Sequence, residues 1–409
     1  MKFLLLLLLS LCSAIASSND TLQNEIPVDE ESANKKDEHR LEDPYRDRTV
    51  NEIFESAVEA YLEEDWDRCI EDFNQALHRF RSFKRMVTNC RHKCKEQAAG
   101  GSPIFPENIE DLHFYERKIR ETLCLMTCNQ DYQEVAGNNA LKLLQPQIER
   151  SFVEYRPYEY LHICYYKKNR HQDAANSVFT FLVKHPDHVA STESLKYYLT
   201  LPEVNEENVK NLEAPAYMPL YFKGVIAYED EHYKETVGLF ENSLKAYMQA
   251  EEECRLYCER PFDQGWHPEF TTSVANHFAY CLKCKRSCSF SLDNVNGDYR
   301  PDILRSHYNY LQFAYYKIGS LKAACAAVES YLLFSPMDET MLHNKDYYKA
   351  QPKVRDEYFT PREEALAYVK RQEYERKLLR FISEEFKAID KRLKEYAKKS
   401  NGEARESSE

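Results

Sequence analysis

Eight cysteines of this chain form four pairs with the spacing C-x-x-x-C. The pairs are Cys90/Cys94, Cys124/Cys128, Cys254/Cys258 and Cys284/Cys288. Residues four apart lie on one face of an α-helix, and a helix poorly accommodates a bond between two such neighbours. Two antiparallel helices would instead bring two pairs opposite each other and allow two parallel disulfide rungs. The spacing therefore predicts two helical hairpins stapled by disulfides.

The first sixteen residues determine whether these cysteines meet an oxidising environment. MKFLLLLLLSLCSAIA carries an early lysine, a leucine-rich run, and Ala14 and Ala16 in the pattern that signal peptidase recognises. The run is too short to span a bilayer, and no later stretch reads as a transmembrane helix. We therefore expect a signal peptide over residues 1–16. Its removal takes Cys12 and leaves twelve cysteines in a compartment where disulfides persist.

The antiparallel geometry predicts a specific connectivity for the four pairs. The expected bonds are Cys90 to Cys128, Cys94 to Cys124, Cys254 to Cys288 and Cys258 to Cys284. This connectivity is a hypothesis, because sequence alone does not fix it. The cysteines left over are Cys69, Cys164, Cys281 and Cys325. We expect some of them to be buried thiols that pack as small apolar groups.

A zinc site is the main alternative for the second hairpin. Its tetrahedral ligands would be His277, Cys281, Cys284 and Cys288. An oxidising lumen disfavours this site, which would also leave Cys254 and Cys258 without partners. Cys281 and Cys284 resemble a C-x-x-C redox motif but lack its strand-helix context. We predict no bound metal and no cofactor.

Repeated helical segments indicate the fold class. Small and aromatic residues recur at tetratricopeptide-like spacing in residues 57–77, 162–186, 224–244 and 312–336. Only 9 glycines and 16 prolines interrupt 409 residues. The chain is therefore predicted to be all-α, a solenoid of tetratricopeptide-like helical hairpins.

The cysteines also reveal an internal duplication. Cys254 and Cys258 follow Cys90 and Cys94 by 164 residues, and the later pairs are separated by 160 residues. Each half reads as a helical repeat, two C-x-x-x-C segments and a further repeat. The predicted parts are a signal peptide (1–16), a disordered acidic leader (17–43), a first half (44–200), a second half (201–345), a C-terminal segment with a charged amphipathic helix (346–400) and a disordered tail (401–409). Asn19 begins a formal glycosylation sequon in the leader.

Catalytic motifs find little support. His185-Pro186-Asp187 and His171-Gln172-Asp173 have the local spacing of a non-haem iron triad, but no β-rich segment supplies the barrel that normally holds one. No phosphate loop, G-x-S-x-G elbow or H-E-x-x-H segment occurs. The formal net charge of −13 disfavours a nucleic-acid partner. We predict no catalytic residues.

Thirty tyrosines stand out in the composition. Tyrosine suits binding surfaces because its ring packs while its hydroxyl stays in water. An aromatic groove could accept a proline-rich segment in the polyproline II conformation. Packing inside the repeats is the preferred interpretation for any single tyrosine.

Several segments carry a family resemblance: EAYLEEDWDRCIEDFNQAL, YLHICYYKKNR, LYFKGVIAYEDEHY and YLQFAYYKIG. Together with the four cysteine pairs, they resemble the leprecan family of the endoplasmic reticulum over residues 44–370. The likeness is closest to the short, non-enzymatic branch, which lacks the C-terminal prolyl 3-hydroxylase dioxygenase domain.

The resemblance implies a non-enzymatic helper subunit in the lumen of the endoplasmic reticulum. The implied partners are a prolyl 3-hydroxylase, a cyclophilin B-type prolyl isomerase and procollagen chains. Two alternatives stay open: a partner of the lysyl hydroxylation machinery, and a secreted component of the extracellular matrix. The chain does not end in a KDEL-type retrieval signal, so luminal retention would depend on a partner.

Overall fold

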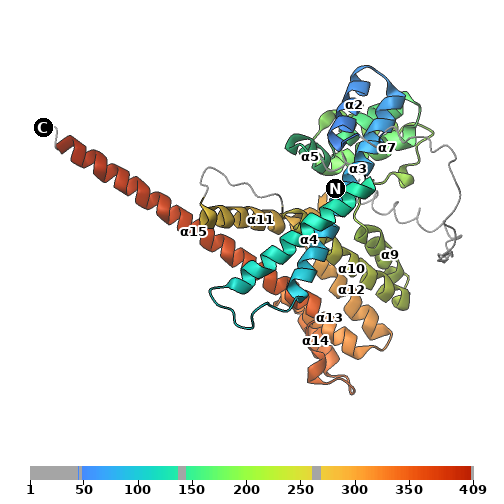
Figure 1. Ribbon diagram of the computed structural model, residues 1–409. Coiled ribbons are helices and arrows are strands. Elements are labelled where there is room, and N and C mark those ends of the chain that lie inside the picture. Colours follow the sequence, from blue (N-terminus) through green and yellow to red (C-terminus); the bar gives the residue numbers. More distant parts are fainter. Residues whose placement is uncertain (1–44, 46–47, 137–143, 260–268, 407–409) are drawn as a thin grey trace, which may run out of the picture. The chain divides into compact units, whose positions relative to one another are not determined.

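The computed structural model describes residues 45, 48–136, 144–259 and 269–406 (Figure 1). The predicted signal peptide, the leader and Asn19 lie outside these residues. The chain divides into two compact units. Unit 1 comprises Met1–Ala214 with Asn296–Asp298, and unit 2 comprises Pro215–Val295 with Tyr299–Glu409. The described part is dominated by helices, and the all-α prediction is confirmed.

Unit 1 is built from paired helices that follow one another along the chain. They are α2 (Val50–Leu62), α3 (Trp66–Gly100), α4 (Leu112–Ala136), α5 (Pro146–Val153), α6 (Arg156–Lys167), α7 (His171–Lys184), α8 (Val189–Tyr198) and the 3-10 helix η1 (Glu206–Asn208). Local signals start several of them. Thr49 and Glu52 form a capping box before α2, and Asp65 accepts from the Arg68 amide before α3.

Unit 2 repeats this order. Its elements are α9 (Tyr217–Glu229), α10 (Tyr233–Tyr257), α11 (Phe270–Leu292), α12 (Ile303–Lys317), α13 (Leu321–Phe334), α14 (Glu339–Lys349), η2 (Asp356–Tyr358) and α15 (Glu363–Glu406). A two-stranded hairpin, β1 (Asn294–Val295) and β2 (Asp298–Tyr299), follows α11. Its turn is Asn296-Gly297, and both residues have positive φ, which this tight hairpin turn requires.

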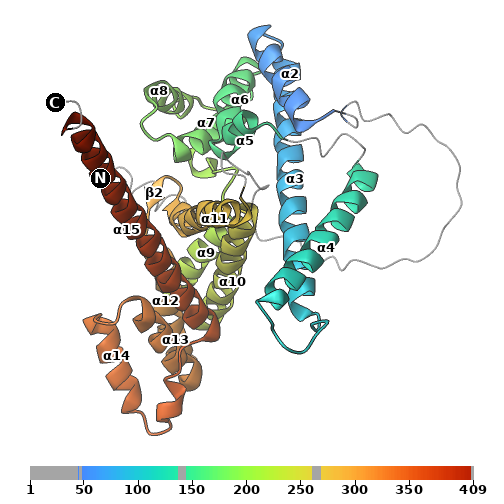
Figure 2. The same ribbon diagram turned by 60° about the vertical axis from the view of Figure 1, so that its left-hand side comes forward.

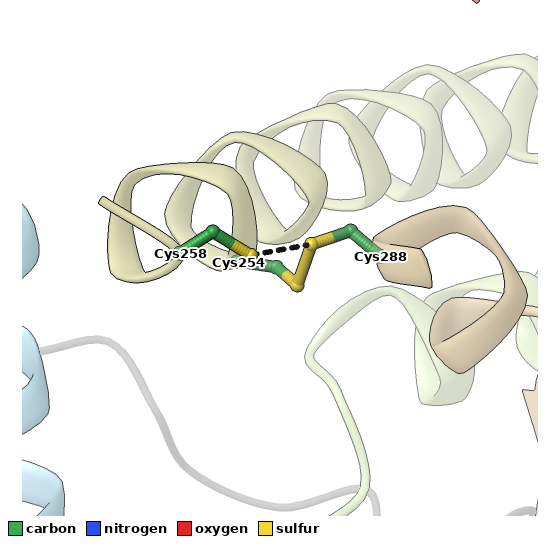
Figure 3. A group of neighbouring side chains, drawn as sticks. All are labelled: Cys254, Cys258 and Cys288. Carbon is green, nitrogen blue, oxygen red and sulfur yellow. Dashed lines mark hydrogen bonds between the residues drawn. A yellow bond between two sulfur atoms is a disulfide. The ribbon is translucent and has the colours of Figure 1, made fainter. Parts of the chain in front are cut away.

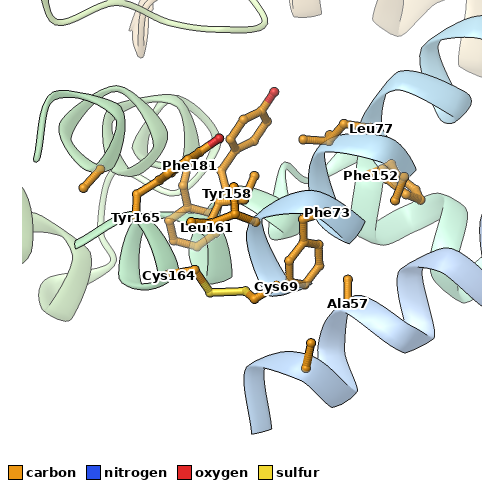
Figure 4. Close-up of a cluster of buried hydrophobic side chains, with 14 of the residues drawn as sticks. Ala57, Cys69, Phe73, Leu77, Phe152, Tyr158, Leu161, Cys164, Tyr165 and Phe181 are labelled. Atoms are coloured by element: carbon orange, nitrogen blue, oxygen red, sulfur yellow. A yellow bond between two sulfur atoms is a disulfide. The ribbon is translucent and has the colours of Figure 1, made fainter. Parts of the chain in front are cut away.

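The core of unit 1 lies between the helices of the predicted repeats (Figure 4). Ala57 and Ala60 of α2 are fully buried, and their small side chains let α3 approach closely. Phe73 of α3 is also fully buried and stacks on Tyr160 with ring centroids 5.2 Å apart. The equivalent stack in unit 2 joins Phe240 and Tyr310 at 4.6 Å.

Each unit includes the segment that follows its last short helix, α8 or α14. After α8, the Leu212 amide donates to Thr180 Oγ1 of α7 over 2.9 Å, so residues up to 214 pack with unit 1. The same bond recurs in unit 2, where the Arg362 amide donates to Ser330 Oγ over 2.9 Å. The main division between the two units falls between Ala214 and Pro215. The boundaries expected from the sequence, after residues 200 and 345, stay a prediction.

Helix α15 is the longest described element, at 44 residues (Figures 1 and 2). It continues past residue 400 to Glu406, because Lys, Glu, Ala and Arg around Gly402 favour a helix strongly enough to carry one glycine. Within the described residues, no helix combines the length and apolar character needed to cross a bilayer.

Candidate functional site: two stapled helical hairpins

The first hairpin joins the C-terminal half of α3 to α4. Cys90 is bonded to Cys128 and Cys94 to Cys124, with Cα–Cα distances of 5.9 and 5.4 Å. Figures 1 and 2 both show the two helices side by side. Three of the four cysteines are buried, and with Leu125 they form a small core of their own. The rungs therefore supply much of what holds this hairpin together.

The loop of this hairpin is fastened by Arg120 and Glu116 of α4. Arg120 Nη2 donates to the carbonyl oxygen of Ser102 over 3.0 Å, and the Ile104 amide donates to Glu116 Oε1 over 3.1 Å. A Cβ at Gly101 would lie 2.7 Å from Arg120 Nη1. Glycine at this position therefore lets the arginine reach the chain that turns back toward α4.

The outer face of α4 is apolar and open to solvent. Its exposed side chains recur at helical spacing and include Leu112, Ile119, Leu123 and Met126, which are 55–60% exposed. Cys124 and Cys128 project from the opposite side, toward α3. The hairpin thus holds an apolar surface on a rigid support.

The second hairpin joins the end of α10 to α11. Cys254 is bonded to Cys288 and Cys258 to Cys284, with Cα–Cα distances of 5.8 and 5.7 Å. Figure 3 shows the neighbouring sulfurs of Cys258 and Cys288, which lie 3.9 Å apart and belong to different disulfides. The four bonds in the two hairpins join the same cysteines that antiparallel geometry predicts from the sequence.

The sulfurs of the second hairpin also resemble a metal site. Those of Cys254, Cys258 and Cys288 all lie within 4.8 Å of one another. This closeness follows from two adjacent rungs, and a sulfur in a disulfide is not the thiolate that zinc binds. The alternative zinc site loses Cys284 and Cys288 to the rungs. Its remaining members, His277 Nε2 and Cys281 Sγ, lie 3.5 Å apart.

A fifth disulfide joins Cys69 of α3 to Cys164 of α6 in the core of unit 1 (Figure 4). Sequence reasoning missed this bond, although both residues occupy small-residue positions in successive helical repeats. The duplication places Thr236 and Ala314 at the equivalent sites of unit 2. Cys325 stays a free buried thiol, and burial raises its pKa to about 11, so it is chemically quiet.

The histidines of the two H-x-D segments serve local packing. His185 Nε2 lies 2.8 Å from the Glu154 carbonyl oxygen, and its ring stacks on Phe181. In the other segment, His171 lies 3.4 Å from Glu203, and Asp173 pairs with Arg170. The described β-structure is a single two-stranded hairpin, so these segments have no barrel around them in the described part of the chain.

Comparison with known proteins agrees with this architecture. The model of the leprecan family TPR-like repeat region matches residues 49–352. Prolyl 3-hydroxylase 1 of Mus musculus is 31% identical over 355 residues, which are 82% of this chain and 47% of that protein. This chain thus spans about half the length of that relative.

Two shorter relatives are covered over most of their length. Cartilage-associated protein of Mus musculus is 29% identical over 341 residues, which are 82% of this chain and 84% of the relative. Endoplasmic reticulum protein SC65 of Homo sapiens is 30% identical over 336 residues, which are 80% of this chain and 76% of the relative. With the family match spanning both units and both stapled hairpins, this chain belongs to the leprecan family.

Proposed function

We propose that this protein is a non-enzymatic scaffold of the endoplasmic reticulum lumen that supports the modification of procollagen. Its leading role is in collagen prolyl 3-hydroxylation, in a complex with a prolyl 3-hydroxylase and a cyclophilin B-type prolyl isomerase. The observation that carries the proposal is the family match over residues 49–352, together with the similarity to prolyl 3-hydroxylase 1 and to the two shorter relatives.

The disulfides support the proposed compartment. Ten cysteines are paired in five disulfides, four of them in two-rung hairpins. Such bonds persist in the secretory pathway and are rare in the cytosol. We propose that all five form in the folded protein and give an otherwise flexible helical solenoid the stiffness that a scaffold requires.

Three features of the structure support a binding role over a catalytic one. The H-x-D segments are engaged in local contacts. The thiol of Cys325 is buried, with a pKa raised by that burial. The exposed apolar face of α4 is instead typical of a surface that meets another protein.

The test is affinity purification of the tagged full chain from a luminal fraction of collagen-secreting cells, followed by mass spectrometry. The proposal expects a prolyl 3-hydroxylase and a cyclophilin-type isomerase in stoichiometric amounts. Recovery of a lysyl hydroxylase in their place would assign the scaffold to lysyl hydroxylation. Quantitative recovery of the protein in the medium, without enzymes, would replace the proposal with a role in the extracellular matrix.

A direct assay addresses catalysis. The purified chain is expected not to decarboxylate 2-oxoglutarate in the presence of Fe²⁺ and a proline-rich peptide. Iron-dependent turnover by the chain alone would contradict the non-enzymatic role. A prolyl 3-hydroxylase assayed in parallel shows that the conditions allow detection.

A further inference from the structure

The internal duplication allows the two units to be compared residue by residue. Residues 50–80 of unit 1 correspond to residues 217–247 of unit 2, and residues 150–214 to residues 300–364. Packing explains why buried positions recur in both copies. An exposed aromatic side chain that recurs at the same position is not explained by packing and indicates binding.

An exposed pair of tyrosines recurs in this way. In unit 1 the hydroxyls of Tyr166 and Tyr197 are hydrogen-bonded over 3.2 Å. In unit 2 the hydroxyls of Tyr316 and Tyr347 are hydrogen-bonded over 2.7 Å. Tyr197 is 49% exposed and Tyr347 is 48% exposed. The two units thus present the same half-exposed ring at the same place.

The core does not need these exposed rings. The next residue in each unit, Tyr198 or Tyr348, is almost fully buried and stacks on the first tyrosine of the pair. The packing requirement at the end of α8 and α14 is therefore met without Tyr197 and Tyr347. The fifth disulfide, which is buried, was not kept in both copies, whereas these surface rings were.

Each pair is grouped with the other partly exposed rings of the repeats in its unit, and we call the whole set the aromatic row. In unit 2 Phe313 links the rings into one series. In unit 1, where Ile163 stands at that position, the rings form two groups. The row of unit 1 comprises Tyr61, Trp66, Tyr160, Tyr166 and Tyr197. The row of unit 2 comprises Tyr228, Tyr233, Tyr310, Phe313, Tyr316 and Tyr347. Each row draws its rings from successive helices of its unit.

The first three rings of the two rows have nearly the same geometry. Tyr61 lies edge-on to Tyr160 with ring centroids 5.0 Å apart, and the equivalent rings of Tyr228 and Tyr310 are also 5.0 Å apart. The centroid distance from Tyr61 to Trp66 is 6.1 Å, as it is for the equivalent pair in unit 2. All these rings are partly exposed.

A lysine accompanies each row. The Nζ of Lys167 lies 5.5 Å from the ring centroid of Trp66, and the Nζ of Lys317 lies 5.4 Å from that of Tyr233. Tyr233 also lines an open hollow of about 640 Å³ at the start of α10. A similar hollow of about 610 Å³, lined by Asp67 and Lys168, lies at the start of α3. The row of unit 2 therefore borders, through Tyr233, space that a ligand can enter. The hollow of unit 1 is lined by residues next to Trp66 and Lys167 and by none of the rings of its row.

We propose that each aromatic row binds a single extended, proline-rich polypeptide in the polyproline II conformation. Such a chain presents flat pyrrolidine rings and backbone carbonyls without internal hydrogen bonds. Aromatic rings pack against the pyrrolidine rings, and hydroxyl or ammonium groups donate hydrogen bonds to the backbone carbonyls. In each tyrosine pair one hydroxyl donates to the other, so the accepting hydroxyl keeps its own proton to donate.

The same chemistry disfavours the other common ligand of aromatic surfaces. Single-stranded nucleic acids also stack on tyrosines, but they require a strongly basic groove. The chain carries a formal net charge of −13, and one lysine accompanies each row. A proline-rich polypeptide carries no backbone charge and needs no such groove.

Two equivalent sites suit a ligand whose own sequence repeats. A repetitive proline-rich chain offers the same segment at many positions, so it can occupy either row. This inference rests on the proposed function, because unfolded procollagen is the repetitive proline-rich chain that the proposed scaffold would meet. The inference goes beyond the proposed function in two ways: it names the residues that contact procollagen, and it states that they bind procollagen as a single chain.

The test measures binding of a fluorescent peptide of about four Pro-Pro-Gly triplets, a length that stays single-stranded, by anisotropy with the purified full chain. Tyr197→Ala and Tyr347→Ala each remove the exposed ring of one row. We expect the double variant to bind at least about tenfold more weakly than the unchanged chain, with each single variant in between. Tyr374→Ala is the matched control, because Tyr374 is 69% exposed on α15 and lies outside both rows.

Unchanged affinity in the folded double variant would overturn the inference, as would an equal loss in Tyr374→Ala. Circular dichroism and thermal unfolding establish that the variants are folded. Co-purification with luminal enzymes provides a separate readout, which the double variant should leave intact. If the unchanged chain co-purifies with the enzymes but does not bind the peptide, only the proposal that the aromatic rows bind proline-rich chains is refuted. If it binds the peptide but has no enzyme partners, only the scaffold proposal is refuted.

Discussion

Arg371 of α15 donates through Nη2 to Glu251 Oε2 of α10 over 2.7 Å, and Glu251 is only 2% exposed. The other oxygen of Glu251 lies 3.5 Å from Arg255 Nη1, which is also 3.2 Å from Glu375 Oε2. Burial raises the pKa of Glu251, and the two arginines oppose that rise. This network attaches α15 to α10 within one helical turn of Cys254.

Removal of Arg371 should release α15. In Arg371→Met the buried carboxylate of Glu251 loses its hydrogen-bonded partner, and we expect the free energy of unfolding of unit 2 to fall by about 2–3 kcal/mol. Urea denaturation measures the loss, and limited proteolysis should cut α15 sooner. Lys377→Met is the control: its pair with Glu373 is exposed, so we expect a change below about 0.5 kcal/mol. Equal effects of the two variants would contradict the anchoring role.

The rungs of a hairpin should not contribute additively. Once Cys90–Cys128 has closed the hairpin, Cys94–Cys124 restricts the unfolded chain little further. We expect Cys94→Ser/Cys124→Ser to cost about 1 kcal/mol, and loss of both rungs to cost about 3–4 kcal/mol. Urea denaturation of the two variants provides the comparison. A cost for both rungs equal to twice that of one would rule out this account.

The missing fifth disulfide of unit 2 can be restored. Thr236 and Ala314 are fully buried and occupy the positions of Cys69 and Cys164. We expect Thr236→Cys/Ala314→Cys to form a disulfide on oxidation and to stabilise unit 2 by about 2 kcal/mol. Non-reducing peptide mapping detects the bond, and thermal unfolding with and without reductant detects the gain. Failure to crosslink would show that the duplication does not extend to this position.

Asp293 should make unit 2 less stable at neutral pH than at mildly acidic pH. Burial raises the pKa of its carboxyl to about 6 and outweighs the hydrogen bond from the Tyr247 hydroxyl. Because the folded pKa exceeds the unfolded value, stability is fully present below about pH 4 and declines as the pH rises through about 6.

Asp293→Asn separates this effect from others. We expect the variant to be more stable than the unchanged chain by about 1 kcal/mol at pH 7.5, a value reduced for partial solvation, and equally stable near pH 4. Asp230→Asn, at an exposed position after α9, should leave the profile unchanged. Denaturation midpoints across this pH range provide the measurement, and a constant difference between the Asp293 variant and the unchanged chain would count against it.

Metal analysis distinguishes rungs from a zinc site. The protein is purified from the secretory pathway in the presence of a thiol-blocking reagent. We expect the reagent to label only cysteines outside the five disulfides, and we expect no stoichiometric zinc. Mass spectrometry of the labelled peptides and elemental analysis give both answers. Labelled cysteines in the second hairpin together with one zinc per chain would reverse the assignment.

The stapled hairpins were predictable because the helix fixes where residues four apart must point. Cys90 and Cys94 can face two cysteines of an antiparallel helix in only one order. The helical repeats could be predicted for a similar reason, because the alanines and aromatic residues of α2 and α3 recur with the helical period. Local rules of this kind are visible in a single sequence.

The features that escaped prediction depend on contacts between distant segments. Cys69 and Cys164 are 95 residues apart, and no spacing rule relates them. The bond from the Leu212 amide to Thr180, which holds the segment after α8 against α7, joins two residues without any marker in the sequence. The aromatic rows were hidden because exposed Tyr197 and buried Tyr198 are adjacent and identical in type.

The double rung between α3 and α4 also bears on mechanics. A single disulfide between two helices still lets them rotate about that bond. Two disulfides one helical turn apart prevent both rotation and sliding of one helix against the other. A molecule bound to the exposed side of α4 near Leu123 would therefore transmit any force on α4 to α3, because the two helices cannot move relative to each other. The force would pass along α3 to Trp66, the ring of the unit 1 aromatic row that lies at the other end of this helix.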